Sequence, residues 1–258
     1  MKTIPNTPST TTVAAATLAL FVALTAQAAT FTLNPSADAF VTTGPTANLT
    51  GNNYGGAGAL SVAAPGLASG EFQSVLRFDL SGARTSFDSQ FGAGQWSIQS
   101  ITLSLTATAP NNAIFNASAA GQFGVSWMQN DSWTEGAGTP ATPTTTGIAF
   151  STLPSFTGAG DEALGTFSFA GGTSGTAAYT LSLTSGFDAD ATAGNLVSFR
   201  LFAADSAVSY LFDSRTFGTT AFRPLLTVVA VPEPGSLALL ATGAALLLGA
   251  RCRRHSHG

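Results

Sequence analysis

Hydrophobic and polar residues alternate along much of this chain, so that every second side chain falls on the same face. In residues 72–80, one face carries the apolar side chains Phe72, Leu76, Phe78 and Leu80. The same period of two recurs in residues 101–105, 123–127, 179–183, 197–201, 208–212 and 225–230. This pattern predicts strands with one buried face and one wet face, as in antiparallel sheets.

Turn-forming residues separate these segments. Clusters of Gly, Pro, Asn and Thr occupy residues 44–58, 109–112, 136–147 and 170–177. No long amphipathic helix is expected among the strands, and only residues 184–194 suggest a short helical turn. About eight to ten strands over this length predict an all-β fold, an antiparallel β-sandwich of the jelly-roll type.

The N-terminus has a different pattern. Lys2 stands in a polar lead, residues 13–24 are apolar, and Ala26 and Ala28 occupy the small-residue positions of a cleavage site. These features are typical of a secretory signal peptide, with a short signal helix over residues 1–28 and cleavage after Ala28. We therefore expect export through the Sec machinery.

The C-terminus carries a second apolar segment. Residues 236–250 contain no charge, and Arg251, Arg253 and Arg254 follow at once. As a helix the segment would span roughly 22 Å, which is short for a bilayer core of about 30 Å. A helix buried in a soluble core would show a polar face, and this segment shows none. We therefore predict one C-terminal transmembrane helix with its basic end in the cytoplasm.

The tail as a whole resembles a known sorting signal. Val231, Pro232, Glu233 and Pro234 precede the apolar segment and the basic end, in the order of the PEP-CTERM signal of Gram-negative bacteria. The resemblance implies that an exosortase in the inner membrane recognises and processes the tail. It also implies delivery to the cell surface or to an extracellular polysaccharide matrix, because carriers of the signal are commonly made alongside exopolysaccharide.

Three parts follow from these assignments: a signal peptide at 1–28, a β-sandwich domain at 29–230 and a sorting tail at 231–258. The middle part is long enough for one domain with a sizeable core. It contains five arginines, no lysine and twelve acidic residues, a net charge of about minus seven. Such a surface repels nucleic acid, so no nucleic-acid partner is expected.

The composition limits the chemistry available to this domain. All histidines lie in the tail, and so does the single cysteine, Cys252. This excludes a Ser-His-Asp triad, a thiol nucleophile and a histidine-based metal site. Carboxylates remain, and Asp131 and Glu135 lie near Trp127 and Trp133 in the sequence. Glycoside hydrolysis needs only two such groups, but a turn and a core tryptophan explain the cluster more simply, and we expect no enzyme activity.

Two kinds of ligand contact stay open. Asp188 and Asp190 are candidate calcium ligands, because they are a spaced pair of hard oxygen donors in an expected loop; solvated loop acids are the alternative. Tyr54 and Trp133 are candidate glycan contacts, since aromatic rings stack on sugars; the alternative is that both rings close the ends of the sandwich.

A second resemblance covers most of residues 31–229. It rests on eight segments: Asp38-Ala39-Phe40-Val41, Asn53-Tyr54-Gly55, Leu60-Ser61-Val62, residues 74–81, the strand 101–105, Asp131-Ser132-Trp133-Thr134-Glu135-Gly136, residues 212–215 and residues 223–228. Their order is similar to the DNRLRE (disaggregatase-related) family of secreted β-sandwiches, which resemble carbohydrate-binding modules. The resemblance implies a structural or glycan-binding component of extracellular polysaccharide. A carboxylate-dependent polysaccharide-active enzyme and a passive surface protein without a ligand are the alternatives.

Overall fold

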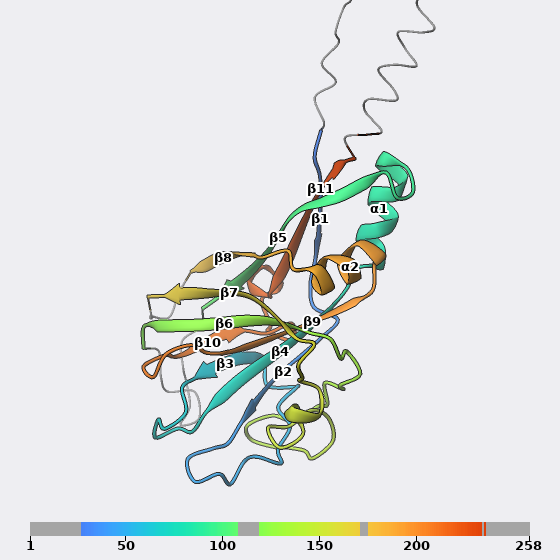
Figure 1. Cartoon of the computed structure of the whole chain (residues 1–258). Helices are drawn as coiled ribbons and strands as arrows, with labels where there is room; N and C mark the ends of the chain where they lie inside the picture. The colour runs from blue at the N-terminus through green and yellow to red at the C-terminus, as the bar shows by residue number, and fades with distance from the viewer. Residues whose placement is uncertain (1–26, 108–118, 171–174, 234, 236–258) are drawn as a thin grey trace, which may run out of the picture. The chain divides into compact units, whose positions relative to one another are not determined.

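The computed structural model describes residues 27–107, 119–170, 175–233 and 235. Every strand pairing within them is antiparallel, and the strands form two sheets (Figure 1). The first sheet has four strands. In spatial order they are β1 (Ala29–Leu33), β11 (Leu225–Pro232), β5 (Trp96–Thr106) and β8 (Thr176–Leu181).

The second sheet has seven strands. Six of them follow the order β10 (Ser209–Asp213), β3 (Ala59–Ala63), β4 (Phe72–Asp79), β9 (Leu196–Ala203), β6 (Gly121–Met128) and β7 (Glu162–Phe169), and β2 (Ala37–Thr42) pairs with β4 beside this path. The order β1-β11-β5-β8 facing β4-β9-β6-β7 is that of an eight-stranded jelly roll, to which β2, β3 and β10 are added. The predicted sandwich is therefore observed.

The predicted apolar faces meet between the two sheets. Leu76, Phe78 and Phe199 of the larger sheet share one fully buried cluster with Ile101 and Val228 of the smaller sheet. The rings of Phe78 and Phe199 lie 5.6 Å apart in a tilted arrangement. Alternation along each strand thus fixes which side chains form the core, as the period of two predicts.

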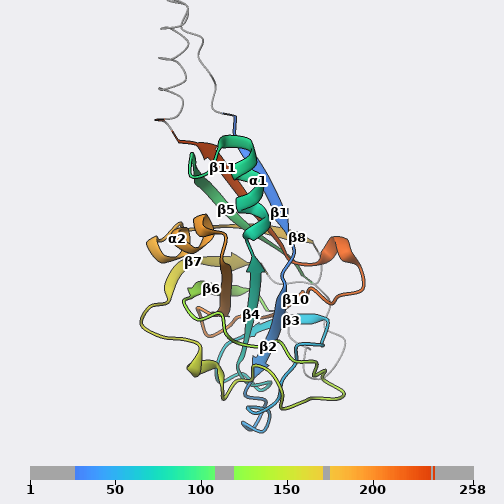
Figure 2. The ribbon, with the colours of Figure 1, turned by 90° about the vertical axis from the view of Figure 1, so that its right-hand side faces the viewer.

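Part of the other face of the larger sheet, over β2 and β4, is buried as well, which the sequence did not indicate. Val75 lies on the face of β4 opposite to Leu76 and Phe78, which the alternation predicts to be wet, yet it is fully buried. The chain between β2 and β3 and the chain between β6 and β7 supply the cover; Figure 2 shows both at the lower end of the view. The second of these segments includes a short 3₁₀ helix, Leu153–Ser155. Another 3₁₀ helix, Thr220–Phe222, precedes β11.

The expectation of no long helix among the strands was wrong. Helix α1 (Ser81–Phe91) has eleven residues and buries Ala83 and Phe87 against the core. Its sequence signal was the spacing of four between these two residues, which places them on one face of a helix. The short helical turn expected in residues 184–194 is present as α2 (Ser185–Ala193), which ends at Gly194 in a left-handed conformation.

The two ends of the domain lie side by side. Ala29, the first residue after the predicted cleavage site, pairs with Ala230 on β11. Strand β11 continues to Pro232, and the Glu233 N–H donates to the Gln95 carbonyl over 2.9 Å. The expected boundary at residue 230 therefore falls inside a paired strand, and Val231 and Pro232 belong to both the domain and the predicted sorting motif.

The segments expected in the membrane lie outside the described residues. Residues 1–26 contain most of the expected signal peptide, with Ala26, and residues 236–258 contain the expected transmembrane helix, with Arg251, Arg253 and Arg254. Pro234 of the sorting motif also lies outside the described residues. Among the described residues, no helix has the length and apolar character needed to cross a membrane.

Candidate functional site

Trp133 lies beneath the covering segment between β6 and β7. It is 1% exposed, and its indole N–H donates to the Ser198 hydroxyl over 2.9 Å. The Arg77 guanidinium lies 4.9 Å from the centre of the ring and donates to the carbonyls of Asp131 and Trp133, both over 2.8 Å. A cation over the ring, together with two bonds to the backbone, fixes the segment to strand β4. Trp133 therefore presents no face to a sugar ring, contrary to one of the two readings of its sequence position.

Tyr54 is equally buried, at 1% exposure. Its ring stacks on Phe40, with centroids 4.5 Å apart and planes 7° from parallel. Phe40 lies on β2, so the tyrosine fastens the chain between β2 and β3 to the sheet. Of the two alternatives for Tyr54, the structure shows a buried ring that packs on protein, as at Trp133.

Asn53 joins the two covering segments. Its side-chain amide donates to the carbonyls of Glu135 and Ile148, over 2.6 and 2.7 Å. Its side-chain oxygen accepts from the N–H groups of Gly55 and Gly138, over 3.1 and 3.2 Å. A fully buried amide must have such partners, because each unsatisfied polar atom costs free energy. Asn53 thus satisfies four backbone groups of irregular chain.

An ion pair also holds the covering segment between β6 and β7 to the larger sheet. The Arg215 guanidinium forms an ion pair with the Glu135 carboxylate, and Glu135 Oε1 also accepts from the Asp38 N–H over 3.0 Å. The Arg215 N–H donates to Asp38 Oδ2 over 2.7 Å. Asp38 is fully buried, and its Oδ1 has no hydrogen-bond partner among the described residues. Burial raises the pKa of Asp38 from 3.8 to about 7, against the opposing effect of the hydrogen bond from Arg215.

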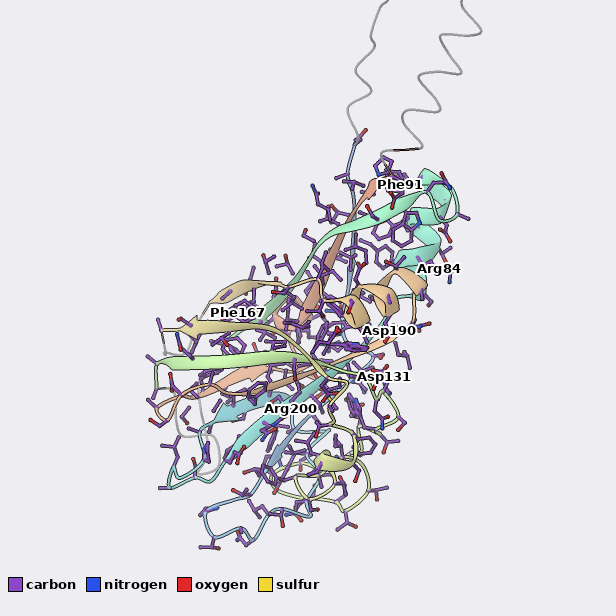
Figure 3. All side chains as sticks on the ribbon, in the orientation of Figure 1. Arg84, Phe91, Asp131, Phe167, Asp190 and Arg200 are labelled. Atoms are coloured by element: carbon purple, nitrogen blue, oxygen red, sulfur yellow. The ribbon has the colours of Figure 1, made fainter. Side chains whose placement is uncertain are left out.

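The two acids considered for catalysis do not form a pair. The Glu135 side chain is occupied by Arg215 and by the backbone of β2. Asp131 is half-buried near Asp190 of α2, as Figure 3 shows. Burial raises the pKa of Asp131, and its hydrogen bond with Ser198 lowers it in part. Asp131 and Glu135 therefore have different partners: Ser198 for Asp131, and Arg215 with the backbone of β2 for Glu135. Trp127, the other residue of this cluster, is in the core between the sheets, as its strand phase predicted.

Asp188 and Asp190 lie in α2 rather than in a loop. Asp190 accepts from the side-chain amide of Asn195 over 2.9 Å, so it ties the helix to the turn that follows it. The described residues contain no group of three or more His, Cys, Asp or Glu side chains that could hold a metal ion. The expected loop geometry for a calcium site was therefore wrong, because the chain is helical there.

A cavity of about 440 Å³ lies between α1, α2 and the start of β5. Asp188 lines it together with Arg84, Asp88 and Trp96. The Trp96 N–H donates to Asp88 Oδ1 over 2.8 Å, and Arg84 lies 3.5 Å from Asp88 Oδ2. Trp96, Asp88 and Arg84 therefore pair with one another in the wall of the cavity.

Glu162 was not identified from the sequence. Its carboxylate accepts from the N–H groups of Gly186 and Phe187, over 3.0 and 2.9 Å, and from the hydroxyl of Thr184. The hydrogen bond from Thr184, followed by those from the two N–H groups, lowers the pKa of Glu162 to about 2. An anion at a helix N-terminus stabilises the helix. No local pattern could reveal this contact, since Glu162 begins β7, more than twenty residues before the helix.

Five residues from the segments that carried the second resemblance therefore converge. Asp38, Asn53, Arg77, Glu135 and Arg215 come from five separate motifs, and all of them hold the covering segments against the larger sheet. We call these five residues, with Tyr54 and Trp133, the fastening cluster. Its chemistry is that of structural support.

Comparison with known proteins identifies the tail. A family model described as the PEP-CTERM protein-sorting motif matches residues 230–254. No curated protein matches the chain. The matched motif confirms the predicted sorting signal. It implies processing by an exosortase and an exported protein that passes through the membrane of a Gram-negative bacterium.

Proposed function

We propose that this chain is a non-catalytic β-sandwich protein of the cell surface or extracellular matrix, where it serves as a structural or glycan-binding component of extracellular polysaccharide. The observation that carries the proposal is the PEP-CTERM motif at residues 230–254, attached to an exported all-β domain. The inner membrane would hold the protein transiently, through the tail, after Sec export.

The fastening cluster supports the non-catalytic part of the proposal. An enzyme that works with carboxylates needs two of them facing one substrate. Here Glu135 is paired with Arg215, and Glu162 is occupied by the N-terminus of α2. Asp38 is fully buried. The acids with the most perturbed environments are thus used to hold the fold.

We also propose that the domain is related to the DNRLRE β-sandwiches. The support is that residues from five of the segments, far apart in the sequence, meet in the fastening cluster. Residues that act together in one cluster explain why these segments occur together in one chain. If this relation holds, the motifs specify how the covering segments attach, and ligand binding has to be sought on another surface.

Cell fractionation tests the proposal. We would express the full chain and a variant in which Glu233 and Pro234 are replaced by alanine, and measure both in membrane, soluble and matrix fractions. The full chain is expected in the surface or matrix fraction, and the variant is expected to stay unprocessed in the membrane. An Ala57→Ser variant, which lies far from the tail in sequence, is the control and should behave as the parent chain. Equal surface delivery of the tail variant would contradict the proposal.

The enzymatic alternative has its own measurement. Purified full chain incubated with matrix polysaccharide should release no reducing sugar ends above the blank. Activity that disappears in an Asp131→Asn variant would overturn the non-catalytic proposal.

A further inference from the structure

The outer face of the four-stranded sheet carries a row of threonines. The strand registers place Thr32 opposite Thr227, Thr227 opposite Thr102, and Thr102 opposite Thr180. Residues directly opposite each other in an antiparallel sheet point to the same side. One threonine from each of the four strands therefore lies in a single line across the sheet, and we call this line the threonine row.

The row faces away from the core. The neighbours of Thr102 along β5, Ile101 and Leu103, are fully buried between the sheets, so Thr102 points outward. Thr32 and Thr180 are exposed, and Thr102 and Thr227 are half-buried by their own neighbours in the sheet. No described element packs on this side.

Further hydroxyl groups lie beside the row on β5. Strands in a sheet lie about 4.8 Å apart, and alternate residues of a strand lie about 6.8 Å apart. Ser100 and Ser104 precede and follow Thr102 on the same face of β5, and each is half-buried. The hydroxyls of Thr102 and Thr180 are 3.5 Å apart, within hydrogen-bonding distance of each other. Hydroxyl groups thus recur across the four strands and along β5, while Leu225 and Val229 flank Thr227 on β11.

The face is also electrically neutral. The four strands of this sheet contain no Asp, Glu, Lys or Arg. The five arginines and twelve acids of residues 29–230 all lie elsewhere. An acidic polymer finds no cation on this face and meets a net negative domain, and a basic polymer finds no anion. The charge therefore favours a neutral partner.

We propose that this face binds a neutral polysaccharide whose chains lie flat and side by side. Each threonine hydroxyl can both donate and accept a hydrogen bond, as a sugar hydroxyl can, and each methyl group can cover an apolar C–H patch of a sugar ring. A flat array has no walls to enclose a single sugar. It gains affinity from many weak contacts made at once, so the partner must be extended and repetitive. This inference rests on the proposed function and names its ligand class and surface.

Binding to insoluble polysaccharide tests the proposal. The full chain in mild detergent would be incubated with microcrystalline cellulose and with chitin, and the bound fraction measured against protein concentration. Soluble alginate would serve as the acidic competitor. The test variant is Thr102→Lys, which places a long charged side chain in the centre of the row. The matched control is Thr166→Lys, because Thr166 is an exposed threonine on β7 of the other sheet.

A second variant keeps the shape of the face. Replacing Thr102 and Thr227 by valine together removes two hydroxyls while it retains the branched side chains that suit a strand. Circular dichroism and thermal melting check that each variant folds. If Thr102→Lys does not fold, the valine variant decides the outcome.

The full chain should bind at least one of the two solids, and alginate should not compete. Thr102→Lys and the double valine variant should weaken binding by about tenfold or more, and Thr166→Lys should leave it unchanged. If the full chain binds and Thr102→Lys binds equally well, this surface assignment is wrong while the glycan-binding function stands. If the full chain binds neither solid, the surface assignment fails, whereas the proposed function is judged by the fractionation test above. Self-association that Thr102→Lys abolishes, without polysaccharide binding, would assign the face to a second copy of the chain and overturn the proposal.

Discussion

At the scale of single residues, strand phase decides which side chains carry the stability of the domain. Phe78 is fully buried and packs on Phe199 across strands β4 and β9. Phe78→Ala should lower the free energy of unfolding by about 3 to 5 kcal/mol. Thr102→Ala, on the outer face of β5, should lower it by well under about 1 kcal/mol. Urea unfolding of both variants measures this, and equal midpoints would show that the assigned phase is wrong.

Asp38 makes the stability depend on pH. Its pKa is raised from 3.8 to about 7 in the folded protein, mainly by burial. Below pH 3.8 the Asp38 carboxyl is protonated in both the folded and the unfolded protein. Between pH 3.8 and about pH 7 it is protonated mainly in the folded protein. Stability therefore falls as the pH rises through this window, by a total on the order of 4 kcal/mol from this group.

Asp38→Asn should remove this dependence, because the amide does not ionise. We expect the stability of the parent chain relative to the variant to fall between about pH 4 and pH 7, and to stay constant above that range. Urea unfolding of both proteins across the range measures the difference. A difference that is the same at every pH would contradict the assignment of the buried proton to Asp38.

At the scale of elements, the two covering segments depend on close approach of backbone. A Cβ at Gly138 would collide with the Asn53 carbonyl, whereas a Cβ at Gly51 would meet nothing within 4 Å. Gly138→Ala should therefore destabilise the domain by about 1 to 3 kcal/mol or detach the segment. Gly51→Ala, the matched control, should change stability by less than about 0.5 kcal/mol. Thermal melting compares them, and equal melting temperatures would show that this contact is unimportant.

The same elements show how far the sequence could be interpreted. Strands such as 72–79 and 196–203 could be predicted because alternation is a local signal that the two packed sheets reinforce. The second buried face could not, since burial of Val75 depends on a segment more than fifty residues away. Tyr54 and Trp133 were ambiguous for the same reason. An aromatic side chain in a turn has one sequence pattern whether its ring faces solvent or a strand.

The fastening cluster illustrates the remaining gap. The types and order of Asp38, Asn53, Arg77 and Glu135 were visible in the sequence, and they marked residues that matter. Their role was not visible, because it consists of hydrogen bonds between segments that no local spacing brings together. Asp38 in particular resembles any acid at the start of a strand, until its burial and its contact with Arg215 are known.

At the scale of the whole molecule, both predicted membrane segments are attached at the same end of one sheet. Ala29 and Ala230 are paired neighbours, and the sorting motif begins within the same strand. A folded domain would therefore present the start of the motif on a paired strand, directly beside the predicted signal-peptide cleavage site. Val231 and Pro232 belong both to β11 and to the sorting motif. Replacing the tail by another sequence would therefore also change the end of β11.

The most direct test of the account removes the tail. Deleting Ser236 to Gly258 leaves β11 intact and removes the C-terminal apolar segment with its basic end. If the tail is the signal that holds and sorts the exported domain, the truncated protein should appear in the soluble exported fraction, with the same melting temperature as the processed parent. Persistent association of the truncated protein with membranes would contradict the account.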